Sequence, residues 1–266
     1  MKKLMFSLAV AGLCGAVFAD VEGANVVGYN TLDEKIPMVM VGISFSDLTS
    51  TDGIRLGDIK GDFVQNDKFM AASSYYDDEE EDTLLDFTTY TYRNGKSGWG
   101  WYDKTNTLAN DVRIKQGTAL YFNAQNMETP EDIPALTVAG QVEKLAYTHP
   151  AFTEPMMMVC SAFPTGFNPN DATRVEFTGL AQNDKIMVES SYYDDEEEDS
   201  ILEFTTYTYR NGKSGWCWYD KTNNAVSASI VNPGQGFYLN LDPDDGERVY
   251  SEVTLKEYSP LAPKAL

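Results

Sequence analysis

Two groups of aromatic residues are the side chains of this chain best suited to binding a ligand. They lie at matching positions in the two halves of the sequence and comprise Tyr90, Tyr92, Trp99 and Trp101, then Tyr207, Tyr209, Trp216 and Trp218. Because side chains two residues apart in a strand share a face, each group predicts an aromatic surface on neighbouring strands. Such a surface can stack on sugar rings while polar Tyr and Trp atoms bond to hydroxyls. The competing interpretation is a hydrophobic core, because large aromatic side chains usually bury their area.

A run of six consecutive acidic residues occurs at 77–82 and again at 194–199. Its carboxylate oxygens are the ligand type that Ca²⁺ prefers. A consecutive run lacks the alternating ligand spacing and the glycine turn that fold a loop around the ion, so we expect solvated charged loops. The alternative is a calcium-stabilised surface, whose candidate ligands are Asp77, Asp78, Glu79, Asp194, Asp195 and Glu196.

The sequence offers little for catalysis. His149 is the only histidine, and it lies between the two similar halves, so neither half has its own imidazole for general base catalysis. A thiol nucleophile would need a free cysteine, and we assign the cysteines to another role below. We therefore predict that the protein is not an enzyme and has no catalytic residues and no cofactor.

The cysteines predict a disulfide. Cys14 lies in the leader described below, which leaves Cys160 and Cys217, each replacing a glycine of the first half, Gly42 and Gly100 respectively. Glycine inside a strand often marks the close approach of another backbone. We therefore expect the two positions to be neighbours in space and Cys160 to be bonded to Cys217, which suits an exported protein. The alternative is two small buried thiols that never meet.

The first residues have the pattern of a secretory signal. Lys2 and Lys3 precede an apolar stretch from Leu4 to Leu13, and small residues lead to Ala19. We expect cleavage after this segment and export to the periplasm, the cell surface or the extracellular space. The apolar stretch is short for crossing ~30 Å of hydrocarbon. We expect no membrane span in the mature chain.

The chain is strongly acidic, with 41 Asp and Glu residues against 20 Lys and Arg residues and a formal charge of -21. Loss of the two leader lysines would make it -21 - 2 = -23. Such a field repels phosphates, so nucleic acid is excluded as a partner. An extracellular polysaccharide or a surface protein remains as the expected partner, and the sequence leaves the oligomeric state open.

The elements that must position these residues occur twice. Residues 73–106 and 190–223 are 34-residue stretches that differ at only four positions. Weaker similarity extends the repeat on both sides at offsets of 117 and 118. We therefore divide the chain into a leader (1–19), a first copy (20–140) and a second copy (141–266), each copy having the size of a domain.

Alternating apolar residues and turn residues predict seven short strands in each copy. In the first copy they are 25–30, 38–45, 68–75, 87–93, 99–103, 119–123 and 136–142. Residues 88–102 have the pattern of a hairpin closed by an Asn94–Gly95 turn. This pattern predicts an all-β protein of two tandem homologous domains, each an antiparallel β-sandwich or a small barrel.

Three short motifs carry a resemblance to a known group. Residues 24–29 (ANVVGY), the Trp-rich hairpin at 88–102 and residues 233–238 (PGQGFY) resemble uncharacterised exported β-repeat proteins of verrucomicrobial and lentisphaeral bacteria. Residues 115–120 (KQGTAL) of the first copy depart from the third motif. The resemblance implies export and a β domain, and it carries over no activity or site residue.

Together these patterns predict a non-catalytic secreted or cell-surface protein with a structural or adhesive role. One alternative is a carbohydrate-binding module that uses the aromatic hairpins, in which two sites on one chain would raise avidity. The other is the calcium-stabilised surface domain.

Overall fold

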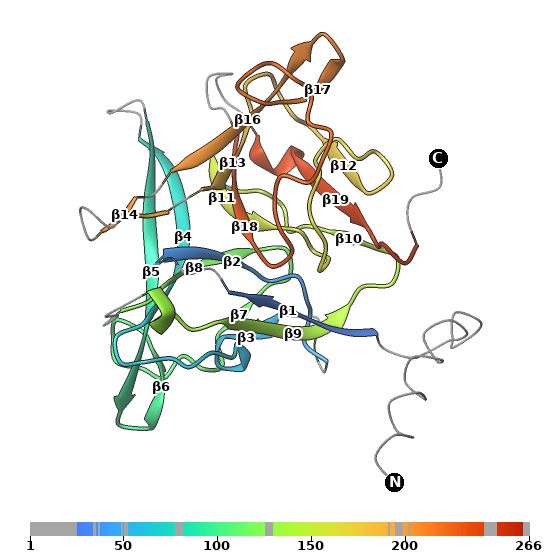
Figure 1. Ribbon diagram of the computed structural model, residues 1–266. Coiled ribbons are helices and arrows are strands. Elements are labelled where there is room, and N and C mark those ends of the chain that lie inside the picture. Colours follow the sequence, from blue (N-terminus) through green and yellow to red (C-terminus); the bar gives the residue numbers. More distant parts are fainter. Residues whose placement is uncertain are drawn as a thin grey trace, which may run out of the picture.

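The computed structural model describes residues 26–33, 36, 38–48, 50, 53–77, 82–125, 130–190, 192–194, 199–201, 203–241 and 249–262. This part of the chain consists of antiparallel strands, loops and short 3₁₀ helices, with no α-helix (Figure 1). The all-β prediction is confirmed.

Each strand range expected in the first copy overlaps an observed strand, although β2 ends at Gly42, three residues before the end of the expected 38–45, and the structure adds two short strands, β3 and β7. The described strands are β1 (Val26–Leu32), β2 (Met38–Gly42), β3 (Ile54–Arg55), β4 (Lys68–Asp77), β5 (Asp82–Gly95), β6 (Gly98–Tyr102), β7 (Arg113–Ile114), β8 (Ala119–Asn123) and β9 (Leu136–Val142). The 3₁₀ helices are η1 (Leu56–Asp58) and η2 (Pro130–Asp132).

The second copy has a related series of strands with one 3₁₀ helix near its end. The strands are β10 (Ala146–Thr148), β11 (Met156–Cys160), β12 (Val175–Thr178), β13 (Lys185–Glu189), β14 (Tyr192–Asp194), β15 (Asp199–Ile201), β16 (Phe204–Gly212), β17 (Gly215–Tyr219), β18 (Gly236–Asn240) and β19 (Thr254–Tyr258). The helix is η4 (Tyr250–Glu252).

Each copy builds a five-stranded antiparallel sheet with the same strand order. The order is β2-β8-β4-β5-β6 in the first copy and β11-β18-β13-β16-β17 in the second. The pairing register is also repeated, since Lys68 lies opposite Thr91 and the matching Lys185 lies opposite Thr208. The sequence repeat is therefore a repeat of sheet topology.

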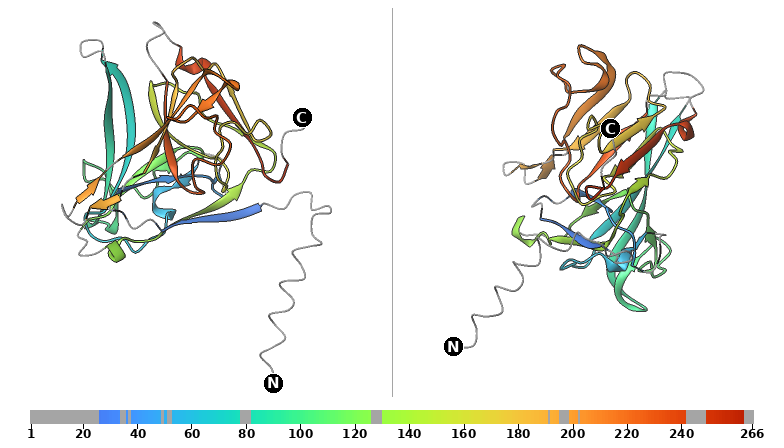
Figure 2. Two further views of the ribbon diagram at one scale, coloured as in Figure 1. Left: turned by 45° about the horizontal axis from the view of Figure 1, so that its top comes forward. Right: turned by 90° about the vertical axis from the view of Figure 1, so that its right-hand side faces the viewer.

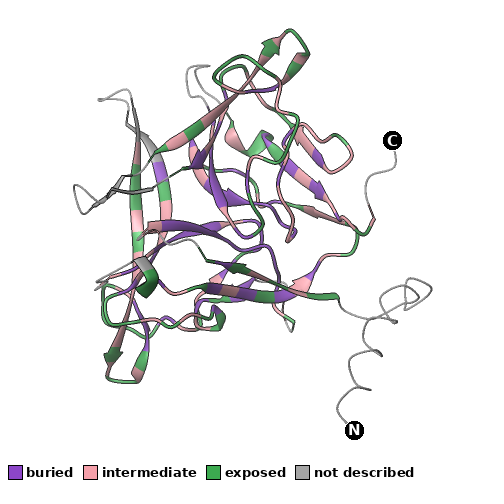
Figure 3. Ribbon diagram, in the orientation of Figure 1, coloured by how far each residue is buried: buried purple, intermediate pink, exposed green. Residues whose placement is uncertain are grey.

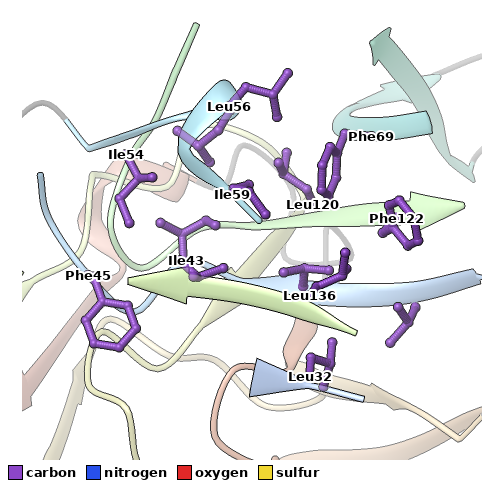
Figure 4. Packing of buried hydrophobic residues seen from close by; sticks show 14 of the residues in the cluster. Leu32, Ile43, Phe45, Ile54, Leu56, Ile59, Phe69, Leu120, Phe122 and Leu136 are labelled. Carbon is purple, nitrogen blue, oxygen red and sulfur yellow. The ribbon is translucent and has the colours of Figure 1, made fainter. Parts of the chain in front are cut away.

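Buried apolar side chains fill the inside of each copy. In the first copy they come from the five-stranded sheet, from the smaller pairs β1–β9 and β3–β7, from η1 and from connecting segments that include Ile43 and Phe45, and Phe163 of the second copy joins the same cluster (Figure 4). A second cluster, around Phe167, Phe237 and Trp218, fills the other copy. Figure 3 shows the buried residues concentrated in the central strands and the exposed ones at the outer hairpins.

The two copies meet through a third buried cluster that contains Met40, Tyr121, Met158 and Tyr238. Their contacts are reciprocal. The Gly42 amide donates to the Gly234 carbonyl at 2.7 Å, and the matching Cys160 amide donates to the Gly117 carbonyl at 3.0 Å. The β-bridge between Val41 and Gln235 likewise has a matching partner between Thr118 and Val159. The copies are therefore related by an internal two-fold arrangement, like the subunits of an isologous dimer.

The predicted Cys160–Cys217 disulfide is wrong, because both thiols are free. Cys160 lies on β11 at the interface of the copies. There it faces Gly42, the residue that matches it in the sequence of the first copy. A Cβ atom added to Gly42 would lie 2.6 Å from the Cys160 Cβ. Cys217 lies on β17, the outer strand of its sheet. Gly42 does mark a close approach, but the approach is to Cys160 of the other copy. Cys160 and Cys217 are not neighbours in the way that was expected.

Cys217 has a separate explanation. In the first copy, a Cβ on Gly100 would lie 2.9 Å from the Asn110 side chain, whose Oδ1 accepts from the Trp101 amide at 2.8 Å. In the second copy Asn170 supplies this bond to the Trp218 amide at 2.9 Å, from a different loop. Moving the asparagine frees the space that the cysteine occupies.

The long hairpin keeps one pairing register in the two copies. In the first copy β4 and β5 pair from Lys68–Thr91 to Asp77–Asp82. In the second copy β13 pairs with β16 and β14 pairs with β15 at the matching positions, and between these two pairs of strands the Ser190 amide donates to the Glu203 carbonyl at 2.9 Å.

Ser74 ties the first hairpin to the second copy. Its amide donates to the Glu154 carboxylate, its hydroxyl donates to the Met156 carbonyl, and the Met156 amide donates to the same hydroxyl at 2.9 Å. The residue that matches Glu154 in the first copy is Ile36, which has no acceptor.

Candidate functional site

The Trp-rich hairpins β5–β6 and β16–β17 each end in a tight turn. The loop of the first hairpin is Lys96–Ser97, two residues beyond the expected Asn94–Gly95 turn, because Gly95 pairs with Gly98. Positions 95 and 98 each require glycine, for different reasons. A Cβ on Gly95 would lie 2.5 Å from the Tyr102 ring, and Gly98 has a φ of 88°, a region that favours glycine.

An aromatic ladder runs from the core of the first copy to its hairpin end. Trp101 is 2% exposed and packs against Phe69 with ring centroids 4.6 Å apart. Tyr92 lies 5.2 Å from Trp101 on the outer side. Trp99 stacks on Tyr92 at 5.6 Å with an interplanar angle of 24° and keeps 54% of its surface exposed. The ladder ends in a supported tryptophan with an accessible face.

The second copy repeats this arrangement with different core partners. Trp218 is 1% exposed and packs against Phe177 at 5.5 Å. Tyr209 stacks on Trp216 at 5.5 Å with an angle of 29°, and Trp216 is 53% exposed. We call the pairs Tyr92–Trp99 and Tyr209–Trp216 the tip pairs.

The opposite side of each hairpin holds the turn in place. The Tyr102 hydroxyl accepts from the Ser97 amide at 3.2 Å and donates to the Gly98 carbonyl at 2.8 Å. The Arg93 guanidinium lies 5.2 Å from the centre of the Tyr102 ring, within the range of a cation–π contact. Tyr219 and Arg210 repeat these contacts in the second copy. Both turns that carry the tip pairs are therefore fixed by hydrogen bonds and a cation–π contact on the opposite side of the hairpin.

A carboxylate orders the loop that follows each hairpin. Asp103 Oδ1 accepts from the Thr107 amide and the Thr105 amide at 2.9 Å each and from the Thr105 hydroxyl at 2.8 Å. The Thr107 amide bond is the main cause that holds the Asp103 pKa below its ordinary value. The pKa of Asp220 is lowered in the same way, mainly by the Asn224 amide.

The structure divides the predicted aromatic surface into core and tip. Trp101 and Trp218 are buried and unavailable to a ligand, as the core interpretation expected. Tyr90 and Tyr207 are half-buried against the cores, and burial raises the pKa of both hydroxyls. The tip pairs alone combine an exposed Trp with a stacked Tyr.

The calcium alternative falls largely outside the described part of the chain. Asp78, Glu79, Asp195 and Glu196 lie outside the described residues, and for Asp77 and Asp194 the structure describes the backbone only. Among the side chains that the structure describes, no group of three or more His, Cys, Asp and Glu residues could hold a metal ion.

A cavity of about 320 Å³ is lined by both copies. The first copy contributes the apolar residues Ile36 and Val39, and the second contributes apolar and polar residues, among them Val188, Glu189 and Gln235. No pattern singled out in the sequence predicted this cavity. The available indication in the sequence was the change from Ala72 to Glu189 at matched strand positions.

His149 belongs to a buried network that the sequence analysis also missed. The Glu257 carboxylate lies 2.6 Å from His149 Nε2, accepts from the Ser161 hydroxyl at 2.6 Å and accepts from the Ala162 amide at 2.8 Å. In a catalytic triad the imidazole lies between the hydroxyl and the carboxylate. Here the carboxylate lies between the other two groups, so the histidine is not placed to activate the serine.

The Cys160 thiol lies next to this network and is equally enclosed. It donates to the Thr118 carbonyl at 3.1 Å, and burial raises its pKa far above the ordinary value. A thiol that stays protonated is a poor nucleophile. Neither buried group is arranged for covalent catalysis.

Two further findings bear on the class of protein. No helix in the described part of the chain has the length and apolar character needed to cross a bilayer. Comparison of the chain with protein-family profiles, with curated proteins and with solved structures gives no match in any of the three.

Proposed function

We propose that this is a non-catalytic, exported adhesive protein whose two tip pairs bind neutral polysaccharide. The observation that carries the proposal is the repeated exposure of Trp99 and Trp216, each stacked on a half-buried Tyr with nearly the same geometry. Large aromatic side chains are usually buried, and an exposed apolar surface often marks a binding site.

The chemistry of the tip pairs favours a sugar ring. An indole face carries partial negative charge, which attracts the slightly positive C–H groups on the flat face of a pyranose. Asn94, Lys96 and Ser97 are exposed beside the tip and supply polar groups for hydroxyls. The net charge of -21 disfavours anionic polymers. A neutral polysaccharide fits both features.

The adhesive role without catalysis is favoured by the buried groups. His149, Glu257 and Cys160 are enclosed and satisfied by neighbours within the chain. Export is proposed from the leader pattern at residues 1–19.

The test is binding of the purified chain to gels containing hydroxyethyl cellulose or galactomannan, with Ca²⁺ and with a chelator. We expect retardation of the wild type and its loss in Trp99→Ala/Trp216→Ala. Leu145→Ala is the matched control, because Leu145 is 70% exposed and lies outside the hairpins. Retardation that persists in the double Trp variant, or no retardation of the wild type, would refute polysaccharide binding by the tips.

A further inference from the structure

The position of the tip pairs within the two-fold arrangement determines how they can be used. The copies meet through β2, β4 and β8 of the first sheet and β11 and β18 of the second. The tip-bearing strands β6 and β17 are the outermost strands of the two sheets. Figures 1 and 2 show the hairpin ends at opposite ends of the molecule.

The two tips are held in a fixed relation. Besides the reciprocal backbone bonds, the Ser44 hydroxyl donates to the Ser161 carbonyl at 2.8 Å and the Gln116 side-chain amide donates to the Ala162 carbonyl at 2.8 Å. All four of these residues are buried. A buried, hydrogen-bonded interface of this kind opposes a rotation that would bring the two tips to one side.

Two sites raise the affinity for one polymer chain only when both can engage it together. Sites that project in opposite directions from a rigid body do not meet this condition for a stiff chain. They remain able to hold a different chain each.

We propose that the protein cross-links polysaccharide, with one tip pair on each of two separate chains or surfaces. This inference rests on the proposed function, because it requires that both tip pairs bind sugar. Under this proposal, the two sites of one protein molecule do not increase its avidity for a single polysaccharide chain.

The test uses microbeads coated with hydroxyethyl cellulose or galactomannan and measures protein binding and bead aggregation separately. We expect the wild type to aggregate the beads and excess protein to disperse them, because each site then fills independently. Trp99→Ala and Trp216→Ala should each still coat the beads with an affinity within about threefold of the wild type but fail to aggregate them. Leu145→Ala should behave as the wild type.

Three outcomes would overturn cross-linking while leaving the proposed function in place. The first is a wild type that binds the beads without aggregating them. The second is a single Trp variant that aggregates beads as well as the wild type. The third is a loss of about 100-fold or more in the affinity of a single variant, which indicates both tips on one chain. Absence of binding by the wild type would instead refute the proposed function itself.

Discussion

At the scale of single residues, the interface of the copies depends on unequal partners at matched positions. Residues that face their own counterpart across a two-fold axis must fit one another. Gly42 meets Cys160, and Gly236 meets Ala119, where an added Cβ would lie 2.4 Å from the Ala119 Cβ. Each pair combines a glycine with a larger residue. Two identical residues would leave either a void or a clash.

The Gly42 and Cys160 pair can be tested by exchange. Gly42→Cys should destabilise the protein by about 1–3 kcal/mol, because the interface becomes overpacked. Adding Cys160→Gly should recover most of the loss, since the thiol introduced at position 42 would have the Gln235 carbonyl nearby, as the Cys160 thiol has that of Thr118. Urea unfolding of the single and double variants measures the coupling, and strictly additive losses would contradict the pairing.

The two free thiols should differ in reactivity. Cys160 is fully buried with a strongly raised pKa, whereas Cys217 is partly exposed. Titration of the native protein with an aromatic disulfide reagent should modify Cys217, and Cys160 only after unfolding. A native protein in which neither thiol reacts and mass spectrometry finds a Cys160–Cys217 bond would contradict the structure.

The loop carboxylates predict a pH dependence. The pKa values of Asp103 and Asp220 are lowered from 3.8 in the folded protein. Their contribution to stability is therefore complete above the unfolded value and is lost as the pH falls through the lower folded values. Between about pH 5 and pH 2, Asp103→Asn/Asp220→Asn should lose less stability than the wild type in urea unfolding. Equal losses would show that these bonds do not favour the ionised form.

At the scale of elements, the first hairpin is held by a contact from outside it. Glu154 of the second copy accepts from the Ser74 amide, whereas the matching residue of the first copy is Ile36, which offers no acceptor. This contact therefore depends on a residue outside the nearly identical blocks 73–106 and 190–223.

Glu154→Ala should loosen the outer part of the first hairpin. Loss of a hydrogen bond to a charged acceptor costs about 1.5–3 kcal/mol, so amides in the outer halves of β4 and β5 should exchange about 10–100 times faster. Hydrogen exchange with mass spectrometry measures this, and exposed Glu252→Ala provides the control. Unchanged exchange in the outer hairpin would mean that packing, and not Glu154, holds it.

The alternation of apolar residues and the repeat were sufficient to predict the main strands and the all-β class. They did not predict β3 and β7, because a strand of two residues is too short to show an alternation of apolar and polar residues. The alternation also did not predict that Trp101 is buried while Trp99 is exposed. The two residues share a strand face, and only the extent of the core along the hairpin separates them.

At the scale of the whole molecule, the two copies act as one body through their shared interface. The reciprocal bonds at Gly42 and Cys160 join the sheets at strands β2 and β11. The tip-bearing strands β6 and β17 lie at the opposite edge of each sheet. The two tip pairs therefore lie at opposite ends of the molecule, and this is the basis of the cross-linking proposal.

Sugar binding by both tip pairs can be tested directly by titration calorimetry with a short neutral oligosaccharide such as cellohexaose, which measures the number of binding sites. We expect two equivalent sites in the wild type, one in Trp99→Ala or Trp216→Ala, and none in the double variant. An unchanged stoichiometry in these variants, shown by circular dichroism to be folded, would contradict this expectation.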